Sequence, residues 1–409
     1  MQGAYGQVLS MNSSNNDLRH LWTLAPEVTF LNHGSFGACP IPVQDRQAEL
    51  RNELERDPVA FITERQEALV DEARRELATQ LGSAVQDLVF VPNATTGVNT
   101  VLSSLQLGSG DEVLLTDHTY NACRNALEHH ALSSGAVLQV VPLELPIRDE
   151  DELVDAIMSR VNRRTRLMLI DHVTSVSALI MPLEKLVPAL QSQGVMVLVD
   201  GAHAPGMLTI DLDKLGADFY TGNCHKWLCA PKGAAFLHVR EEHHEEVVPL
   251  VISHGWNTPR SGRSRLHDLF DWTGTADFTA VACIPQALKT LGALFDGGWE
   301  ELQTRNHELA IAARRELCTA LGTVEICPDS MLGSMACVTL PNAFHADQFG
   351  NTGVERAQQI YSELRTRGFQ VPVMESPDGA IFVRVSAQVY NRMEQYARLA
   401  SALAEIAHH

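Results

Sequence analysis

The sequence predicts an α/β protein with a mainly parallel, seven-stranded sheet, followed by a smaller α+β domain. Seven short apolar runs alternate with helical patterns through the first two thirds of the chain. This alternation is typical of parallel strands covered by helices on both faces. The pattern changes near Pro285, where long helices and a few strands take over. We therefore expect an N-terminal segment at 1–30, a large domain at 31–285 and a small domain at 286–409.

The first elements precede the sheet. Residues 1–16 are rich in Gly, Ser, Asn and Gln, a composition that favours loose order. A short strand should begin near Thr29 and run into a Gly-rich turn that ends at Pro40. A charged helix is predicted over 43–81, broken near Pro58 and ended by Gly82.

The strands and helices of the two predicted domains follow from apolar periodicity. The seven runs of the sheet lie at 88–91, 112–115, 137–141, 166–170, 195–199, 219–220 and 234–239. Helical patterns lie between most of them, at 97–105, 122–134, 150–161 and 183–194. The small domain should contain helices at 287–294, 301–321 and 391–406, and strands at 335–340 and 380–385.

Charge and cysteine usage narrow the class of protein. The 409 residues include 31 Lys and Arg against 50 Asp and Glu, a formal net charge of −19. This balance argues against a general nucleic-acid or anionic-membrane binder. No apolar stretch is long enough to cross a bilayer, and no secretory signal opens the chain. The eight scattered cysteines form no CxxC pair, so we expect no metal site and a cytoplasmic location.

A lysine and an aspartate that ends a predicted strand upstream of it indicate a cofactor site. Asp200 closes the apolar run 195–199, and Lys226 follows 26 residues later beside Trp227. This arrangement suits pyridoxal 5'-phosphate (PLP), because the amine can form an imine with its aldehyde while the carboxylate keeps the pyridine nitrogen protonated. An apolar setting would lower the pKa of Lys226. His203 would reach the phenolic oxygen of the ring. The alternatives are a structural cap or a metal ligand for Asp200 and a surface position for Lys226.

A second pattern suits a phosphate. Residues 89–99 (Val-Phe-Val-Pro-Asn-Ala-Thr-Thr-Gly-Val-Asn) read as a strand, a turn and a helix start. Unpaired amides at such a start, helped by a Thr hydroxyl, can bind a phosphate dianion. An ordinary Thr cap is the alternative. Asn223 and His225 are close to Lys226 in sequence and could also donate to the phosphate.

Together these motifs resemble the class V aminotransferase group of fold-type I PLP-dependent enzymes. The resemblance is plainest over 195–239. Residues 30–40 (Phe-Leu-Asn-His-Gly-Ser-Phe-Gly-Ala-Cys-Pro), 92–99, 172–175 (His-Val-Thr-Ser) and 223–227 (Asn-Cys-His-Lys-Trp) are similar to the isopenicillin N epimerase-like branch. The likeness covers nearly the whole chain and implies the fold-type I architecture. It is specific for cofactor and fold, and weakly specific for substrate.

The resemblance implies a role for each residue. Lys226, Asp200 and His203 are the implied catalytic residues. The implied cofactor-binding residues are Ala94, Thr95, Tyr120, Ser175, Asp200, His203, Asn223, His225, Lys226 and Thr275. Tyr120 is preferred as the aromatic that stacks on the pyridine, with His118 as the alternative. Thr275 matches a threonine that reaches the phosphate of the partner subunit, which implies a homodimer with shared sites.

The substrate side is implied by the same resemblance. Arg384 lies in the alternating run 381–386 and matches the arginine that binds the substrate carboxylate. A guanidinium suits a carboxylate bidentately. Asn32 and His33 would line the same pocket, and His254 is a weaker candidate. The expected partner is therefore a small amino acid with a free carboxylate.

One departure from the group narrows the reaction. Cysteine desulfurases use a mobile cysteine in the small domain, and this chain has none between residues 350 and 385. Sulfur transfer through a persulfide is therefore not expected. Once PLP has stabilised a carbanion at Cα, three outcomes stay open: epimerisation, which is the prediction, β-elimination by a C–S lyase, and transamination. A PLP-binding regulator is a further alternative, but the segment before Thr29 leaves no room for a DNA-binding domain.

Overall fold

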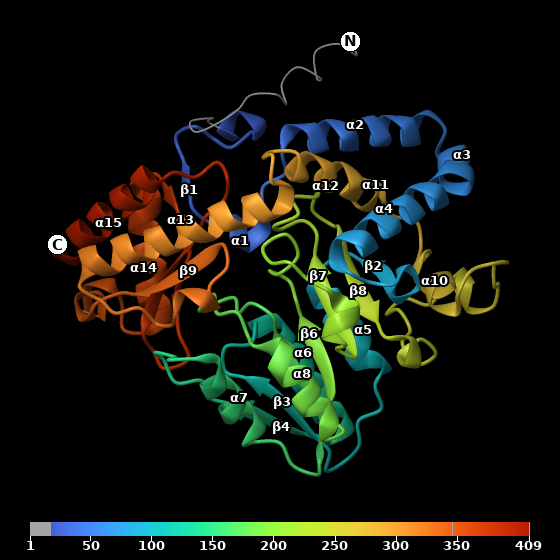
Figure 1. The fold of residues 1–409 in the computed structure, drawn as a ribbon, viewed down its shortest axis with the longest axis horizontal. Coiled ribbons are helices and arrows are strands. Elements are labelled where there is room, and N and C mark those ends of the chain that lie inside the picture. The colour runs from blue at the N-terminus through green and yellow to red at the C-terminus, as the bar shows by residue number, and fades with distance from the viewer. Residues whose placement is uncertain (1–17, 346, 409) are drawn as a thin grey trace.

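The computed structural model describes residues 18–345 and 347–408, and its central feature is a seven-stranded sheet (Figure 1). The strand order is β2-β8-β7-β6-β5-β3-β4. Only β8 opposes its neighbours, so the predicted mainly parallel sheet is confirmed. The strands are β2 (Leu88–Val91), β3 (Glu112–Thr116), β4 (Val137–Val141), β5 (Thr165–Asp171), β6 (Met196–Asp200), β7 (Phe219–Asn223) and β8 (Ala235–Val239).

Both faces of this sheet are buried. Along β5, Leu167 and Leu169 belong to one hydrophobic cluster, and Met168 and Ile170 belong to the other. Alternate side chains therefore pack on opposite faces, as expected for a sheet covered on both sides. The helices between the strands are α5 (Ala94–Ser104), α6 (Asn121–Ser134), α7 (Glu150–Met158), α8 (Leu183–Ser192) and α9 (Leu212–Leu215).

The charged helix predicted ahead of the sheet is divided into segments. They are α2 (Ile41–Arg56), α3 (Pro58–Ala60), a π-helical turn (Phe61–Arg65) and α4 (Gln66–Leu81). Pro58 starts α3, in agreement with the predicted break. Gly82 has φ of 57° and its amide donates to the carbonyl of Ala78, so this glycine ends α4 as predicted.

The C-terminal part contains an antiparallel sheet of order β11-β12-β9 (Figure 1). Its strands are β9 (Met335–Thr339), β11 (Val373–Glu375) and β12 (Ile381–Ser386). The helices from residue 265 onward are α10 (Arg265–Phe270), α11 (Thr279–Ala282), α12 (Ile284–Gly292), α13 (Gly298–Leu321), α14 (Gly353–Thr366) and α15 (Met393–His408). The sequence reasoning missed α14, although Thr352 and Glu355 form a capping box at its start.

The beginning of the described chain joins this C-terminal part. Strand β1 (Thr29–Phe30) pairs in parallel with β10 (Phe369–Gln370). The Gly-rich turn predicted after β1 contains a short helix, α1 (His33–Phe36). The segment that carries Asn32 and His33 therefore runs from the C-terminal sheet toward the central one. The three-part division at residues 30 and 285 stays a prediction.

Candidate active site

Three neighbouring parallel strands end in polar side chains at one edge of the central sheet. Asp171 ends β5, Asp200 ends β6 and Asn223 ends β7. Asp171 and Asp200 are paired in register, and Asp200 is only 3% exposed. Ligands of α/β sheets bind beyond the carboxyl ends of the strands. The pairing of the strands alone, without the loops, therefore brings these groups together.

Lys226 lies at the same edge, in the loop between β7 and β8. Its Nζ is 3.2 Å from Nε2 of His203. Burial lowers the pKa of Lys226 to about 8, Asp200 opposes this shift, and the guanidinium of Arg384 adds to it. A substantial fraction of the amine is therefore neutral near pH 8, the form that acts as a nucleophile or a base.

The backbone of Lys226 is held by two donors. Its carbonyl accepts hydrogen bonds from the amide of Cys229, at 3.1 Å, and from Nε2 of His33, at 3.0 Å. Nδ1 of His33 in turn accepts from the Tyr390 hydroxyl at 2.7 Å. Burial lowers the pKa of His33 to about 3, so the ring is neutral at physiological pH. Both ring nitrogens of His33 contact protein groups, which makes it an anchor of the lysine loop. Its role in substrate binding stays a prediction.

Gly37 explains why the segment after His33 lies so close to the lysine. Its φ is 68°, and a Cβ there would lie 2.0 Å from the His225 carbonyl oxygen and 2.9 Å from Cα of Lys226. Only glycine allows this backbone contact. The sequence motif at residues 30–40 therefore packs directly against the lysine loop.

The carboxylate of Asp200 is oriented by two donors. The Cys123 thiol donates to Oδ2 at 3.1 Å, and the Ala202 amide donates to Oδ1 at 3.0 Å. Burial raises the pKa of the Cys123 thiol far above its usual value, and the Asp200 charge adds to this shift, so the thiol keeps its proton. Sequence reasoning missed Cys123, because nothing in its local sequence distinguishes it from a core cysteine.

Three buried polar atoms around Lys226 have no hydrogen-bond partner among the described residues. They are Nδ1 of His203, Oδ2 of Asp171 and Nε of Arg384. Burial lowers the pKa of His203 and raises that of Asp171, with nearby Lys226 and Asp200 adding to the respective shifts. A buried polar group without a partner costs about 1–3 kcal/mol. A polar ligand bound between these residues would supply partners, so the site fits a cofactor such as PLP.

The start of α5 lies against the same strand ends. A Cβ at Gly97 would lie 2.1 Å from Oγ1 of Thr221, so this glycine lets the helix pack closely on β7. The amide of Ala94 donates to Oδ1 of Asn223 at 2.9 Å, and Asn93 caps the helix. The Ala94 amide predicted for the phosphate is thus bonded to another predicted ligand. Thr95 lies half-buried in the first turn.

His225 is oriented by the loop itself. Its Nδ1 donates to the carbonyl of Ala234 at 3.1 Å, and burial lowers its pKa to about 4. In this neutral tautomer Nε2 carries no proton. A hydrogen bond from Nε2 to a phosphate therefore requires a phosphate dianion to favour the protonated ring. Phosphate binding by His225 stays a prediction, and it requires the protonated ring.

Arg384, on β12, faces the site from the C-terminal sheet. It is 2% exposed and donates to the Ser175 carbonyl and hydroxyl, to Oγ of Ser35 at 3.2 Å and to Oδ1 of Asn32 at 3.5 Å. No carboxylate among the described residues forms an ion pair with it. Burial lowers the pKa of Arg384 to about 10. The structure brings together Arg384, Asn32, Ser35 and Ser175. The binding roles of Arg384, Asn32 and Ser175 stay predictions.

The two candidates for stacking on a ring differ in setting. His118 is buried, with Nδ1 2.8 Å from the hydroxyl of Ser177. Tyr120 precedes α6 and is 45% exposed. Tyr120 and Cys337 both oppose the burial-driven fall in the pKa of Arg384, so Tyr120 lies within electrostatic reach of the guanidinium. Thr275 and His254 are exposed and distant in sequence from the other residues. The choice of stacking residue stays a prediction.

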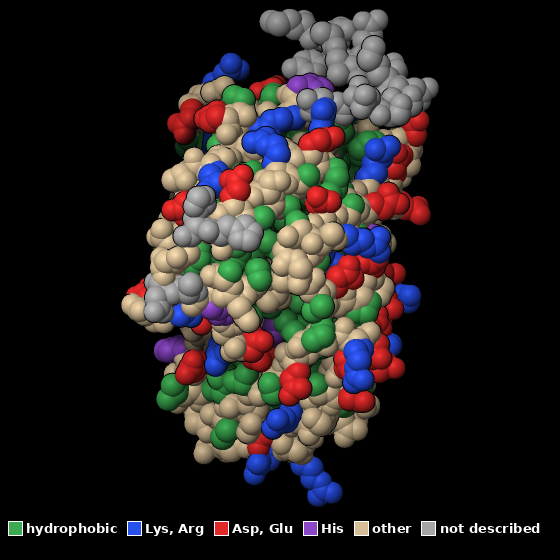
Figure 2. Space-filling view, turned by 90° about the vertical axis from the view of Figure 1, so that its left-hand side faces the viewer, with side chains coloured by type: hydrophobic (Ala, Val, Ile, Leu, Met, Phe, Trp, Pro, Cys, Tyr) green, Lys and Arg blue, Asp and Glu red, His purple; other side chains and the backbone are tan. Residues whose placement is uncertain are grey.

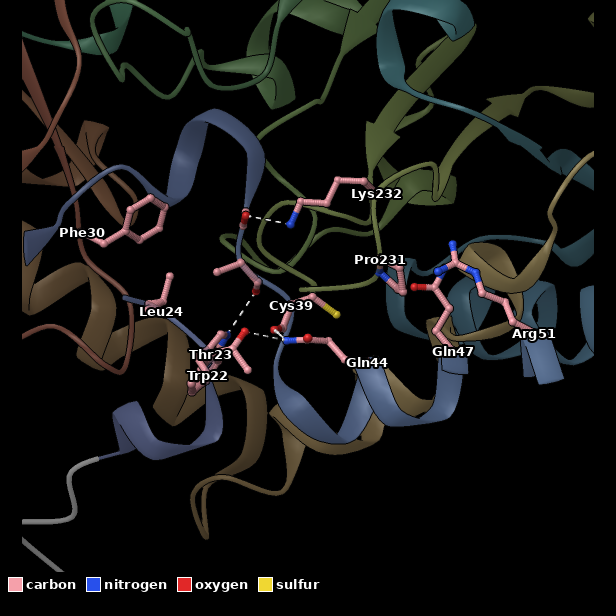
Figure 3. Close-up of a pocket in the computed structure, with 12 residues that line it drawn as sticks. Trp22, Thr23, Leu24, Phe30, Cys39, Gln44, Gln47, Arg51, Pro231 and Lys232 are labelled. Atoms are coloured by element: carbon pink, nitrogen blue, oxygen red, sulfur yellow. Dashed lines mark hydrogen bonds between the residues drawn. The ribbon is translucent and has the colours of Figure 1, made fainter. Parts of the chain in front are cut away.

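A separate cavity of about 470 Å³ is lined in part by Gly37, Ala38 and Cys39 (Figure 3). Its walls come from residues 22–39, from α2 and from the turn at Pro231 and Lys232. Lys232 donates to the Gly37 carbonyl at 3.0 Å across one side of it. Lys226 does not line this cavity, so it is distinct from the predicted cofactor site.

Two observations concern the nucleic-acid and membrane partners that the sequence argues against. On the face shown in Figure 2, acidic and basic side chains are interspersed, and no broad basic patch stands out. Among the described helices, none combines the length and the apolar character needed to cross a bilayer.

The fold and this site define a PLP-dependent enzyme of fold-type I. The model of the family "Aminotransferase class-V" matches residues 54–399, and the chain belongs to that family. Its cofactor is pyridoxal 5'-phosphate, as predicted.

Two similar proteins fit the predicted branch, but their names indicate different reactions. The isopenicillin N epimerase of Streptomyces clavuligerus is 34% identical over 393 residues, which cover 93% of this chain and 95% of the relative. A probable chloroplastic L-cysteine desulfhydrase of Arabidopsis thaliana is 31% identical over 404 residues, which cover 92% and 82%. The predicted likeness to the epimerase-like branch is confirmed.

Solved structures confirm the predicted fold. A mutant of the enzyme C-DES with glycine covalently linked to its PLP cofactor superposes with a TM-score of 0.80 at 20% identity, covering 96% of this chain and 100% of that one. The cystine C–S lyase C-DES in complex with cysteine persulfide gives 0.79 at 21% identity, covering 92% and 97%. At these identities the likeness concerns the fold.

Proposed function

We propose that this protein is an amino-acid epimerase that exchanges the proton at Cα of a small substrate with a free carboxylate. One observation carries the proposal. Arg384 is 2% exposed, its Nε has no partner among the described residues, no carboxylate there pairs with it, and its charge acts on Lys226. A buried cation suited to a carboxylate therefore belongs to the same site as an amine that can transfer a proton.

The residues of the site would hold PLP in the following way. Asp200 would face the pyridine nitrogen, His203 the phenolic oxygen and Lys226 the aldehyde carbon. The phosphate would lie against Ala94, Thr95, Asn223 and His225. When bound, PLP supplies an electron sink that makes the Cα proton acidic. Arg384 would bind the substrate carboxylate, with Asn32, Ser35 and Ser175 keeping its guanidinium in place.

Proton transfer is assigned to two residues. Lys226 would remove or return the proton on one face of Cα, since its lowered pKa leaves part of the amine neutral near pH 8. Inversion needs a second group on the opposite face. Tyr120 is proposed for this role, because it is exposed at the carboxyl edge of the sheet and lies near Arg384. The name of the Streptomyces clavuligerus relative agrees with this reaction.

A C–S lyase is the second candidate function. Relatives from Arabidopsis thaliana and Oryza sativa carry the name L-cysteine desulfhydrase, at 29–31% identity. β-Elimination needs one base at Cα and no group on the opposite face, so Lys226 alone would be enough. Transamination is the third candidate, and no observation in this chain favours it over the other two.

Incubation in deuterated water with each enantiomer of a set of amino acids separates the candidates. An epimerase gives Cα deuterium and the opposite enantiomer by chiral mass spectrometry. A lyase gives pyruvate, ammonia and sulfide from cysteine. Accumulation of these products without the opposite enantiomer would rule out the epimerase reading.

The Tyr120→Phe variant tests the second proton donor. We expect inversion to fall by about 100-fold, as is typical when a general acid or base is lost, while exchange with retention through Lys226 persists. Tyr361→Phe, on α14, is the matched control and should leave both processes unchanged. Undiminished inversion in Tyr120→Phe would remove Tyr120 from the mechanism.

The assembly is also proposed to be a homodimer in which Thr275 reaches the phosphate of the partner's site. Thr275 is exposed in the loop between α10 and α11. Leu250, Val251, Ile252 and Trp256 are each about half exposed nearby in the sequence, an apolar surface of the kind that partners cover. A cytoplasmic location stays a prediction, and the Arabidopsis thaliana relative is named as chloroplastic.

A further inference from the structure

We propose that Asp87, Asp213 and His238 form a binding site for a divalent transition-metal ion, best represented by Zn²⁺. The three residues come from different elements: Asp87 immediately precedes β2, Asp213 lies in α9 and His238 lies in β8. One ligand atom from each lies within 4.8 Å of the others. The expectation of no metal site rested on the cysteines alone, and these three residues are far apart along the chain.

The site lies at the end of the sheet opposite Lys226. His238 pairs with Leu88, the first residue of β2, and with Tyr220, near the start of β7. Asn223, beside the lysine loop, pairs instead with Ala235 at the other end of β8. An ion bound here would not touch the catalytic residues. It would tie the segment before β2 and helix α9 to the central sheet.

His238 is the observation that points to a ligand. It is 2% exposed, and neither of its ring nitrogens has a hydrogen-bond partner among the described residues. Nε2 lies 3.9 Å from Oδ2 of Asp87 and 3.9 Å from Oδ1 of Asp213. These distances are too long for hydrogen bonds. They suit two ligands that share one ion, since Zn–N and Zn–O distances of about 2.0–2.2 Å place ligand atoms about 3–4 Å apart.

A neighbouring cluster shows what an ordinary ion pair looks like in this protein. Nε2 of His243 is 3.2 Å from Oδ1 of Asp218, and this hydrogen bond raises the pKa of His243. His238 makes no such bond: the nearest oxygens of Asp87 and Asp213 are 3.9 Å from its Nε2, and neither ring nitrogen has a hydrogen-bond partner among the described residues.

Further groups lie beside the two carboxylates. Nε2 of His244 lies 3.1 Å from Oδ1 of Asp87 but is 2.9 Å from the Val239 carbonyl, and Oδ1 of Asp87 has no hydrogen-bond partner among the described residues. The amide of Ala84 donates to Asp213 at 3.2 Å. Such contacts orient metal ligands in known sites. One imidazole and two carboxylates leave a coordination position for water, and this donor set suits Zn²⁺.

The experiment uses tag-free, PLP-loaded protein that has been dialysed against EDTA. Calorimetric titration with ZnCl₂ measures affinity, and mass spectrometry of the desalted protein measures zinc per chain. Asp213→Asn is the main variant, because the Asp213 side chain is 55% exposed and its loss should not prevent folding. Glu242→Gln, in the neighbouring cluster, is the matched control, and His238→Gln is the second test.

We expect one Zn²⁺ per chain in the wild type and in Glu242→Gln, with a higher thermal midpoint when zinc is added. Asp213→Asn and His238→Gln should bind zinc at least about tenfold more weakly and lose the thermal shift, with Asp213→Asn retaining full activity. A crystal grown with zinc should show anomalous density among the three side chains. Equal zinc affinity in the wild type and Asp213→Asn, or no stoichiometric binding in the wild type, would overturn the proposal.

Discussion

The Cys123 thiol and the Asp200 carboxylate form a hydrogen bond 3.1 Å long, Sγ to Oδ2, beneath the site that holds Lys226. The bond joins α6 to the end of β6. Because burial keeps the thiol protonated, it acts only as a donor. Together with the Ala202 amide it fixes the plane of the carboxylate that would face the pyridine nitrogen.

Replacing Cys123 should therefore weaken the hold on PLP without removing it. In Cys123→Ala the carboxylate loses a donor worth about 0.5–1.5 kcal/mol, so we expect the dissociation constant of PLP to rise about two- to tenfold. Cys123→Ser should restore most of the affinity. The measurement is fluorescence titration of the PLP-free protein, with Cys318→Ala on α13 as the control. Weakening by Cys318→Ala of the same size would show that the effect is not local.

The contact between His33 and the Lys226 carbonyl predicts a loss of stability. His33→Ala removes hydrogen bonds to Lys226 and Tyr390 and leaves a cavity, so the free energy of unfolding should fall by about 2–4 kcal/mol. Chemical denaturation measures it. The visible absorption band of bound PLP should also shift as the loop loosens. A variant of normal stability with a raised KM would instead support a direct role for His33 in substrate binding.

The lowered pKa of Lys226 predicts that the free energy of unfolding of the PLP-free protein depends on pH. The folded pKa is about 8 against an ordinary 10.5, so below pH 8 folding must bury a charged amine. The free-energy cost of burying this amine decreases as pH rises from 8 to 10.5. Lys226→Met should therefore be more stable than wild type by about 3 kcal/mol at pH 7, and the gain should shrink toward pH 10.5. Lys289→Met, on α12, is the control. A gain that does not change with pH would contradict the assigned pKa.

The guanidinium of Arg384 has hydrogen bonds but no carboxylate partner among the described residues, and this predicts opposite effects on stability and binding. Arg384→Gln removes a buried charge that lacks a carboxylate partner among the described residues, so thermal stability should be equal or higher. The KM for a carboxylate substrate should rise about 10- to 200-fold, since a hydrogen bond to a charged group contributes about 1.5–3 kcal/mol. Steady-state kinetics and a thermal melt measure the two effects. An unchanged KM would remove Arg384 from the substrate site.

A mixing experiment tests the proposed shared site. Lys226→Ala and Thr275→Ala proteins, each weakly active alone, should recover activity when mixed if both residues serve one site from different subunits. Light scattering measures the mass of the assembly. A monomeric mass, or no recovery on mixing after subunit exchange, would contradict the dimer.

The fold could be predicted because its strands are short, apolar and buried on both faces. All seven predicted runs are strands of one sheet. The elements that were missed are short or exposed. Strands β10 and β11 have two and three residues, which is too few for a periodic signal. Helix α14 has a mostly polar sequence, and its signals are the capping box and the sparse apolar positions Ala357, Ile360 and Leu364.

The site was predictable where chemistry follows a strand. Asp200 and Asn223 end strands, and the same signal could have identified Asp171, which follows the run at 166–170. Contacts across the fold could not be predicted. Nothing in the local sequence indicates that Tyr390 supports His33, that Ser35 contacts Arg384 or that Ala94 bonds to Asn223. These pairs depend on how distant segments pack.

The reversal of β8 has a consequence for the catalytic lysine. Because β7 and β8 are antiparallel, the chain leaves and re-enters the sheet at the same rim, with Asn223 opposite Ala235. Lys226 therefore lies in a loop that is anchored at both ends by paired strands. With the amine held at this rim, we expect differences in reaction among related enzymes to arise in the walls of the pocket.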